Sequence, residues 1–92
     1  MTQIEVTRVG EQPSVTRFEV VVADVEGSST THAVSLADVD RDRLAGSYAS
    51  PEDFIRACFA FLLEREPKES ILRSFDVSVV STYFPEFERE IR

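Results

Sequence analysis

The stretch that decides the fold is "SPEDFIRACFAFLLEREP", residues 50–67, because it carries the clearest helical signal in the chain. Ser50 suits an N-cap position, and Pro51 suits the first position of a helix, where no amide hydrogen is needed. Asp53 follows in the first turn and can complete the cap. The apolar residues that come next at helical spacing are Phe54, Ile55, Cys58, Phe59, Phe61, Leu62 and Leu63. A helix that is apolar around most of its circumference is expected to lie in the interior.

Pro67 separates this helix from the segment that follows. It lacks an amide hydrogen and biases Glu66 away from helical angles, so we expect the helix over residues 51–66 to end there. A second helix can begin with Pro67 in its first turn. The residues that this second helix would turn inward are Ile71, Leu72 and Phe75.

The C-terminal stretch "DVSVVSTYFPEFEREI", residues 76–91, allows two interpretations. Val and Thr favour a strand over residues 77–83. The apolar residues, however, recur in alternating steps of three and four, which is typical of a helix. They are Val77, Val80, Phe84, Phe87 and Ile91. Asp76 stands in an N-cap position, so the sequence favours a helix that is interrupted or restarted near Pro85.

The first part of the chain alternates polar and apolar residues, as half-buried strands do. Three such runs cover residues 4–9, 15–25 and 31–36, and the turn-rich segments 10–14 and 26–30 separate them. Short connections of this kind predict an antiparallel meander. The side chains expected on one face of this sheet are Ile4, Val6, Phe18, Val20, Val22, Val34 and Leu36.

These patterns together predict an α+β fold within a single domain, residues 1–92. A three-stranded antiparallel meander over residues 1–36 is followed by three or four helices over residues 38–92, packed on one face of the sheet. The first of these helices, "DVDRDRLAG" (38–46), is expected to close with Gly46 as a left-handed cap.

The other face of the expected sheet is mixed in character. Its polar residues are Glu5, Thr7, Glu19, Thr31 and Ser35, but Val9 and Val21 lie among them. A sheet of three strands also has two free edges. Both features allow self-association, so a homodimer or another protein partner is compatible with this sequence.

Composition restricts the classes of partner. The chain has a formal net charge of −7, with 10 Lys and Arg against 17 Asp and Glu, and no basic cluster. Nucleic-acid binding depends on basic side chains placed against phosphates, so it is not expected unless Arg8, Arg17 and Arg41 converge on one face. A basic protein partner is allowed by the charge.

Membrane insertion is not expected either. The longest apolar run, Ala57 to Leu63, is far shorter than the roughly 20 residues needed to cross a bilayer. The N-terminal "MTQIEVTRVG" lacks the basic start and apolar stretch of a signal peptide. We therefore expect a cytoplasmic protein.

A resemblance covers about residues 50–92. The runs "SPEDFIRACFAF" (50–61), "EREPKESIL" (64–72) and "YFPEFE" (83–88) resemble the C-terminal half of a group of short uncharacterised bacterial proteins. The resemblance implies a small independent domain. It supplies no catalytic residue, cofactor or partner.

His32 is the one histidine and the first candidate for chemistry. As a general base it would need an orienting acid or a nucleophile within reach, and none is adjacent in sequence. Asp24 and Tyr83 are the residues that could join it in a pocket between sheet and helices. Strand parity instead places His32 at the margin of the packed face, which favours a structural role.

Neither a catalytic cysteine nor a metal site is expected. Cys58 lies in the middle of the most apolar helix, where a thiol acts as a small hydrophobic side chain. The alternating acids Asp38, Asp40 and Asp42 lack the glycine and the terminal glutamate of a calcium loop. We therefore assign no catalytic, cofactor-binding or metal-binding residues.

Two groups of residues are candidates for an interaction surface. The charged corner after the central helix consists of Glu64, Arg65, Glu66, Lys68 and Glu69. Of these, Glu64, Arg65 and Lys68 are the candidate contact residues, and Glu64 could pair with Lys68 if helical geometry continues past Pro67. The aromatic group near the C-terminus consists of Tyr83, Phe84 and Phe87. These aromatic residues either pack in the core or anchor a partner.

The leading hypothesis for function is a non-enzymatic protein-interaction or regulatory module. It rests on the lack of a catalytic constellation, the acidic surface and the aromatic C-terminal segment. The alternative is a small-molecule-binding protein or minor hydrolase that uses a pocket between sheet and helices near His32.

Overall fold

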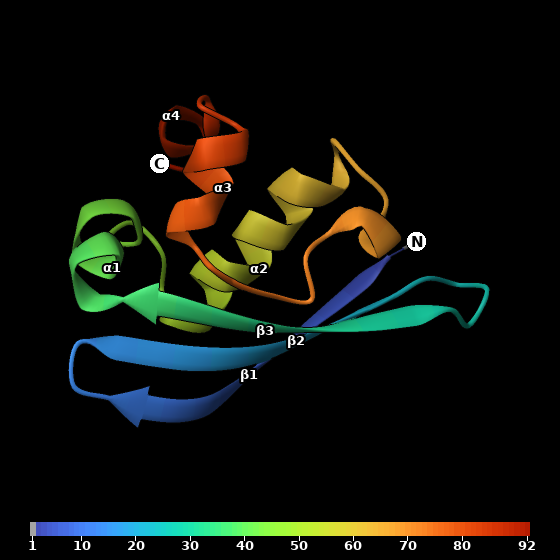
Figure 1. Cartoon of the computed structure of the whole chain (residues 1–92), viewed down its shortest axis with the longest axis horizontal. Helices are drawn as coiled ribbons and strands as arrows, with labels where there is room; N and C mark the ends of the chain where they lie inside the picture. The colour runs from blue at the N-terminus through green and yellow to red at the C-terminus, as the bar shows by residue number, and fades with distance from the viewer. Residues whose placement is uncertain (1) are drawn as a thin grey trace.

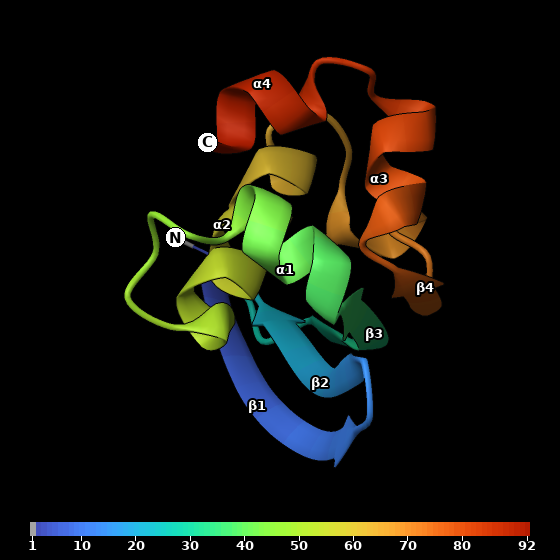
Figure 2. The same ribbon diagram turned by 90° about the vertical axis from the view of Figure 1, so that its left-hand side faces the viewer.

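The computed structural model describes residues 2–92 as a four-stranded sheet with helices on one of its faces (Figure 1; Figure 2). This arrangement confirms the α+β class. The strands are β1 (Gln3–Gln12), β2 (Val15–Ala23), β3 (Ser29–Ala37) and β4 (Ser74–Asp76). The helices are α1 (Asp38–Leu44), α2 (Pro51–Leu63), α3 (Ser78–Tyr83) and α4 (Phe87–Ile91), and η1 (Lys68–Ser70) is a single 3₁₀ turn.

The sheet differs from the expected three-stranded antiparallel meander in one respect. β1, β2 and β3 do pair antiparallel in chain order, but β4 adds a fourth strand that runs parallel to β3. The sheet is therefore mixed, and Figure 2 shows β4 beside β3 at the edge opposite β1.

The expectation of a helix that begins at Pro67 is wrong beyond its first turn. Only η1 is helical; Ile71 already has extended backbone angles, and the chain then enters β4. The reason lies in β3, whose outer edge would otherwise be unpaired: Ala33 N–H donates to the carbonyl of Arg73 at 2.8 Å. A short helix is marginal by itself, so pairing with the sheet determines the conformation here.

The strand side chains predicted to face the core do so. Phe18, Val20, Val22, Val34 and Leu36 are buried, and Ile4 and Val6 pack partly buried against them. The helical residues that complete the same cluster include Phe54, Ile55, Cys58, Phe59, Phe61, Leu62, Val77, Val80, Phe87 and Ile91. One hydrophobic cluster thus joins the sheet to α2, α3 and α4.

The start of α2 is confirmed, but its end comes earlier than expected. The Ser50 hydroxyl accepts a hydrogen bond from the Asp53 amide at 3.1 Å, and Pro51 is the first helical residue. The helix ends at Leu63 rather than at residue 66. The expected left-handed cap at Gly46 is also wrong: Gly46 directly follows the C-cap Ala45, but Gly27 is the one glycine in residues 2–92 with a positive φ.

The C-terminal segment forms two helices, α3 and α4, on either side of Pro85, as the helical spacing predicts. The strand alternative for residues 77–83 is not adopted, although β4 immediately precedes them. Asp76 acts close to its predicted role, since its carboxylate accepts a hydrogen bond from the Ser78 amide at 3.0 Å.

Ser50→Ala should reduce the free energy of unfolding by about 1 kcal/mol, because the Asp53 amide loses its partner at the start of α2. Ser50→Asp should restore most of this loss. Urea denaturation of both variants measures the effect. Ser47→Ala, at an exposed position before the cap, is the control and should change little; an equal loss there would contradict the capping role.

Candidate functional site

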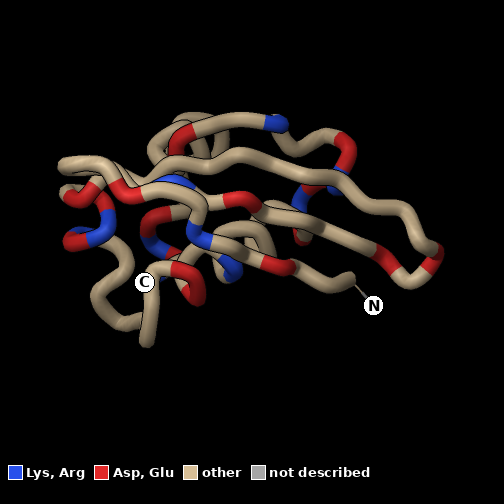
Figure 3. The backbone as a smooth tube through the Cα atoms, turned by 90° about the horizontal axis from the view of Figure 1, so that it is seen from below, with Lys and Arg blue, Asp and Glu red and all other residues tan. Residues whose placement is uncertain are grey.

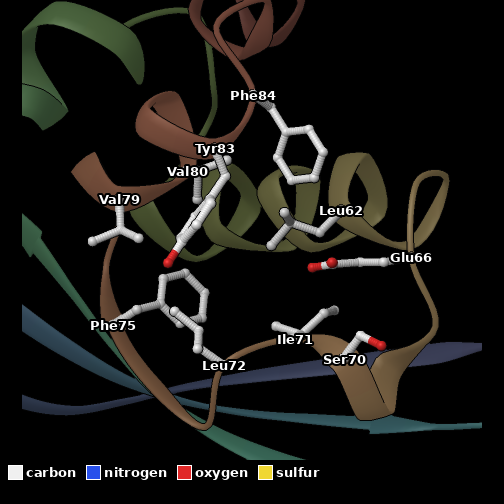
Figure 4. Close-up of a pocket in the computed structure, with 10 residues that line it drawn as sticks. All are labelled: Leu62, Glu66, Ser70, Ile71, Leu72, Phe75, Val79, Val80, Tyr83 and Phe84. Atoms are coloured by element: carbon white, nitrogen blue, oxygen red, sulfur yellow. The ribbon is translucent and has the colours of Figure 1, made fainter.

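A pocket of about 370 Å³ lies between α2, α3 and the extended segment that leads to β4 (Figure 4). The residues that line it are Leu62, Glu66, Ser70, Ile71, Leu72, Phe75, Val79, Val80, Tyr83 and Phe84. The walls are thus mainly aliphatic and aromatic, with two polar side chains. Ligand sites in proteins commonly combine these features.

The extended segment and α3 place apolar side chains at the rim of the pocket. Leu72 is 47% exposed and Tyr83 is 65% exposed, although both are large and apolar in the main. Val79 and Tyr83 stand four residues apart on α3 and therefore share one face of the helix. Phe84 is half-buried, with its ring 5.9 Å from that of Phe61. Large apolar side chains are therefore gathered at the rim, which is typical of a surface that binds a partner or ligand.

Glu66 is the single charged residue among those that line the pocket. Figure 4 shows its carboxylate pointing inward between Leu62 and Ile71. The side chain is half-buried, and no hydrogen bond or ion pair joins the carboxylate to any residue from 2 to 92. The pocket therefore has a negative group at one end of an apolar wall.

Arg65 of the predicted charged corner connects helices rather than facing outward. Its guanidinium lies 3.6 Å from the centre of the Phe61 ring and donates to Glu86 at 3.1 Å and to Glu90 at 3.0 Å. Burial opposes the charge, but the bonds to Glu86 and Glu90 prevail and raise the pKa of Arg65. Arg65 thus ties the end of α2 to α4 and to the turn before it.

Lys68 connects η1 to the turn between β2 and β3. Its ammonium group donates to Asp24 at 2.8 Å and to Glu69 at 2.7 Å. These hydrogen bonds raise the pKa of Lys68, and the bond from Lys68 lowers the pKa of Asp24. The expected pair between Glu64 and Lys68 is absent from the described residues, because the helix ends before Pro67.

The residues predicted for an interaction surface therefore separate into three sets. Tyr83 and Phe84 line the pocket. Glu64, Arg65 and Lys68 are all engaged in ion pairs within the chain, Glu64 as an exposed partner of Arg65 at 3.3 Å. Phe87 is 0% exposed, with its ring 5.1 Å from that of Phe61, so it belongs to the core and cannot form part of a surface.

His32 is 1% exposed, deeper than the margin of the packed face at which it was expected. Its Nδ1 lies 2.7 Å from the carbonyl oxygen of Leu72, which can only accept, so Nδ1 carries the proton. Its Nε2 then accepts from the Thr30 hydroxyl at 2.8 Å. Both nitrogens are occupied, and Asp24 is bound to Lys68 instead. This geometry argues against His32 as a general base.

The remaining candidates are placed as structural residues. Cys58 is buried, and burial raises the pKa of its thiol. Asp38 and Asp40 pair with Arg41 and Arg43 of the same helix. Within residues 2–92, no three side chains of the metal-binding types stand close enough to hold an ion.

Two further observations concern nucleic acid and membranes as possible partners. Figure 3 shows basic and acidic positions interspersed along the backbone, and Arg8 pairs with Glu11 and Glu52. Arg41 is likewise paired with an acid, so neither residue presents an isolated positive charge. Across the described part of the chain, no helix has both the length and the apolar character to span a bilayer.

The sequence interpretation missed most of the pocket. It placed Ile71, Leu72 and Phe75 on the inner face of a helix, whereas the extended backbone turns Leu72 outward. Glu66 was expected in the charged corner at the end of the helix, whereas the structure places it in the lining of the pocket. Ile71 and Phe75 are four residues apart, a spacing that places two side chains on one face of a helix and also on one face of a strand, so it could not reveal the extended backbone.

Arg65→Ala should lower the urea midpoint, because it removes the stacking on Phe61 and the bonds to Glu86 and Glu90 together. Arg65→Lys should recover only part of the loss, since lysine lacks the planar fork. Arg89→Ala, an exposed arginine on α4, is the matched control and should leave the midpoint nearly unchanged. Equal effects of Arg65→Ala and Arg89→Ala would contradict a connecting role.

The unfolding free energy should depend on pH through His32. Burial lowers its pKa from 6.5, and nearby Arg73 lowers it further against the opposing effect of the Leu72 hydrogen bond. Below 6.5 the unfolded chain binds a proton that the folded chain does not, so stability should fall as pH drops from there towards the folded pKa. Urea denaturation across this range should show a smaller decline for His32→Gln. Parallel curves for both proteins would refute this linkage.

No family model, curated protein or solved structure matches the chain. The resemblance of residues 50–92 to short bacterial proteins therefore stays a prediction. The fold and the geometry of the pocket are the basis for any proposal about function.

Proposed function

We propose that this chain is a non-enzymatic interaction module that binds a segment of a partner protein in the pocket between α2 and α3. The observation that carries this proposal is the apolar rim, where Leu72 and Tyr83 stay exposed beside a hollow lined by core residues. Large apolar side chains around a concavity are typical of sites that receive an aromatic or aliphatic anchor.

The size of the pocket supports an anchor side chain over a bulky ligand. At about 370 Å³ it stands near the lower end of the range for ligand sites, roughly 300–1,000 Å³. Its lining also lacks a hydroxyl bound to a base: no hydrogen bond joins Ser70 or Tyr83 to Glu66, and His32 is bound elsewhere. A partner segment that inserts one apolar side chain suits both properties.

Dimerisation through the exposed edge of the sheet, strand β1, is less well supported than binding of a partner in the pocket. β1 has an irregular register between Arg8 and Gly10, and such bulges discourage pairing between edges. Arg56 also donates to the carbonyl of Ile4 on this strand. The pocket is therefore the better candidate for contact with a partner.

Selection from a library of random peptides displayed on phage should enrich sequences with one aromatic or aliphatic residue at a fixed position. The corresponding synthetic peptides should shift the amide NMR signals of Leu72, Val79 and Tyr83. Leu72→Ser and Tyr83→Ser should each weaken binding about tenfold or more, as truncation of an interface anchor does.

Val25→Ser is the matched control, because Val25 is also exposed but lies in the turn between β2 and β3. It should bind the selected peptides as the unchanged chain does. Enriched peptides that shift signals on β1 instead, or that bind all three variants equally, would overturn the proposal.

A further inference from the structure

The carboxylate of Glu66 differs from its acidic neighbours in having no cation beside it. Glu69 is bonded to Lys68, and Glu86 is bonded to Arg65. Glu66 instead points into the pocket between aliphatic side chains (Figure 4). The two basic residues closest in sequence are thus turned away from it, one towards α4 and one towards the turn between β2 and β3.

The direction of these two side chains follows from the backbone. Arg65 lies in the turn that ends α2, where its side chain reaches back over the ring of Phe61. Lys68 lies beyond Pro67, where the chain has changed direction, and its side chain reaches Asp24 instead. Within the described chain, Glu66 is therefore left for a group that comes from outside.

A carboxylate among apolar walls is a selective group. Partial removal of water weakens its hydration, and an ion pair in such surroundings is stronger than one on an open surface. An apolar ligand without a positive charge would cover Glu66 and leave the carboxylate without compensation. A ligand with a cation next to its apolar anchor would satisfy it.

We propose that the pocket recognises a segment of a partner protein in which an aromatic or aliphatic anchor is followed closely by Lys or Arg, with Glu66 as the residue that selects the cation. This inference rests on the proposed function. The net charge of −7 acts in the same direction, because it attracts basic segments at a distance.

The test uses three acetylated and amidated hexapeptides, Gly-Ser-Phe-Lys-Ser-Gly and the versions with Gln or Glu in place of Lys. Each is titrated into the isotope-labelled chain, and the dissociation constant is taken from the amide shifts of pocket residues. The Lys peptide should bind about fivefold to tenfold more tightly than the Gln peptide, and the Glu peptide should bind most weakly.

Glu66→Gln should remove the difference between the Lys and Gln peptides, and the salt dependence of the Lys peptide should decrease with it. The Glu66 carboxylate forms no hydrogen bond or ion pair within residues 2–92, so the variant should unfold at the same urea midpoint as the unchanged chain. Glu64→Gln is the matched control: it removes the same charge two residues away, outside the pocket lining. It should preserve the preference for lysine.

The outcomes separate the two proposals. Equal binding of all three peptides at the pocket, or a lysine preference that survives Glu66→Gln, would overturn the role of Glu66 and leave the interaction module standing. Absence of pocket shifts with every peptide would count against the module itself. Phenethylamine that binds as tightly as the Lys peptide would show that a small amphiphilic amine, and not a protein segment, is the occupant.

Discussion

Hydrogen bonds between β3 and the segment of residues 72–77 are the interaction on which the rest of the structure depends. Ala33 N–H donates to the carbonyl of Arg73 at 2.8 Å, and Val77 N–H donates to the carbonyl of Ser35 at 3.0 Å. These bonds hold the segment extended against the sheet. Because it follows β3 instead of packing as a helix along α2, a space remains between α2 and α3, and that space is the pocket.

The parts of the fold that the sequence predicts well are those governed by neighbouring residues. Ser50 and Pro51 determine where α2 begins through contacts within one turn. Pro85 separates α3 from α4 because its ring excludes a regular helix there. The alternation of β2 places Phe18 and Val20 on the core side, since one face of the sheet is covered by helices.

The parts that it does not predict depend on residues far away in the chain. The spacing of Ile71 and Phe75 fits a helix and an extended segment equally, and the unpaired edge of β3 decides between them. His32 and Leu72 are 40 residues apart, yet their hydrogen bond fixes the wall of the pocket. Glu66 gains its position in the same way, because it faces a cavity that exists only after β4 has paired. Local pattern carries no information about such contacts.

The single thiol of the chain has a practical consequence. Cys58 is 2% exposed at the centre of α2, and burial suppresses the thiolate that alkylating reagents require. Its rate of alkylation therefore measures how often α2 separates from the sheet. Cys58 can thus report local unfolding without an engineered label, and all alkylation comes from this one cysteine.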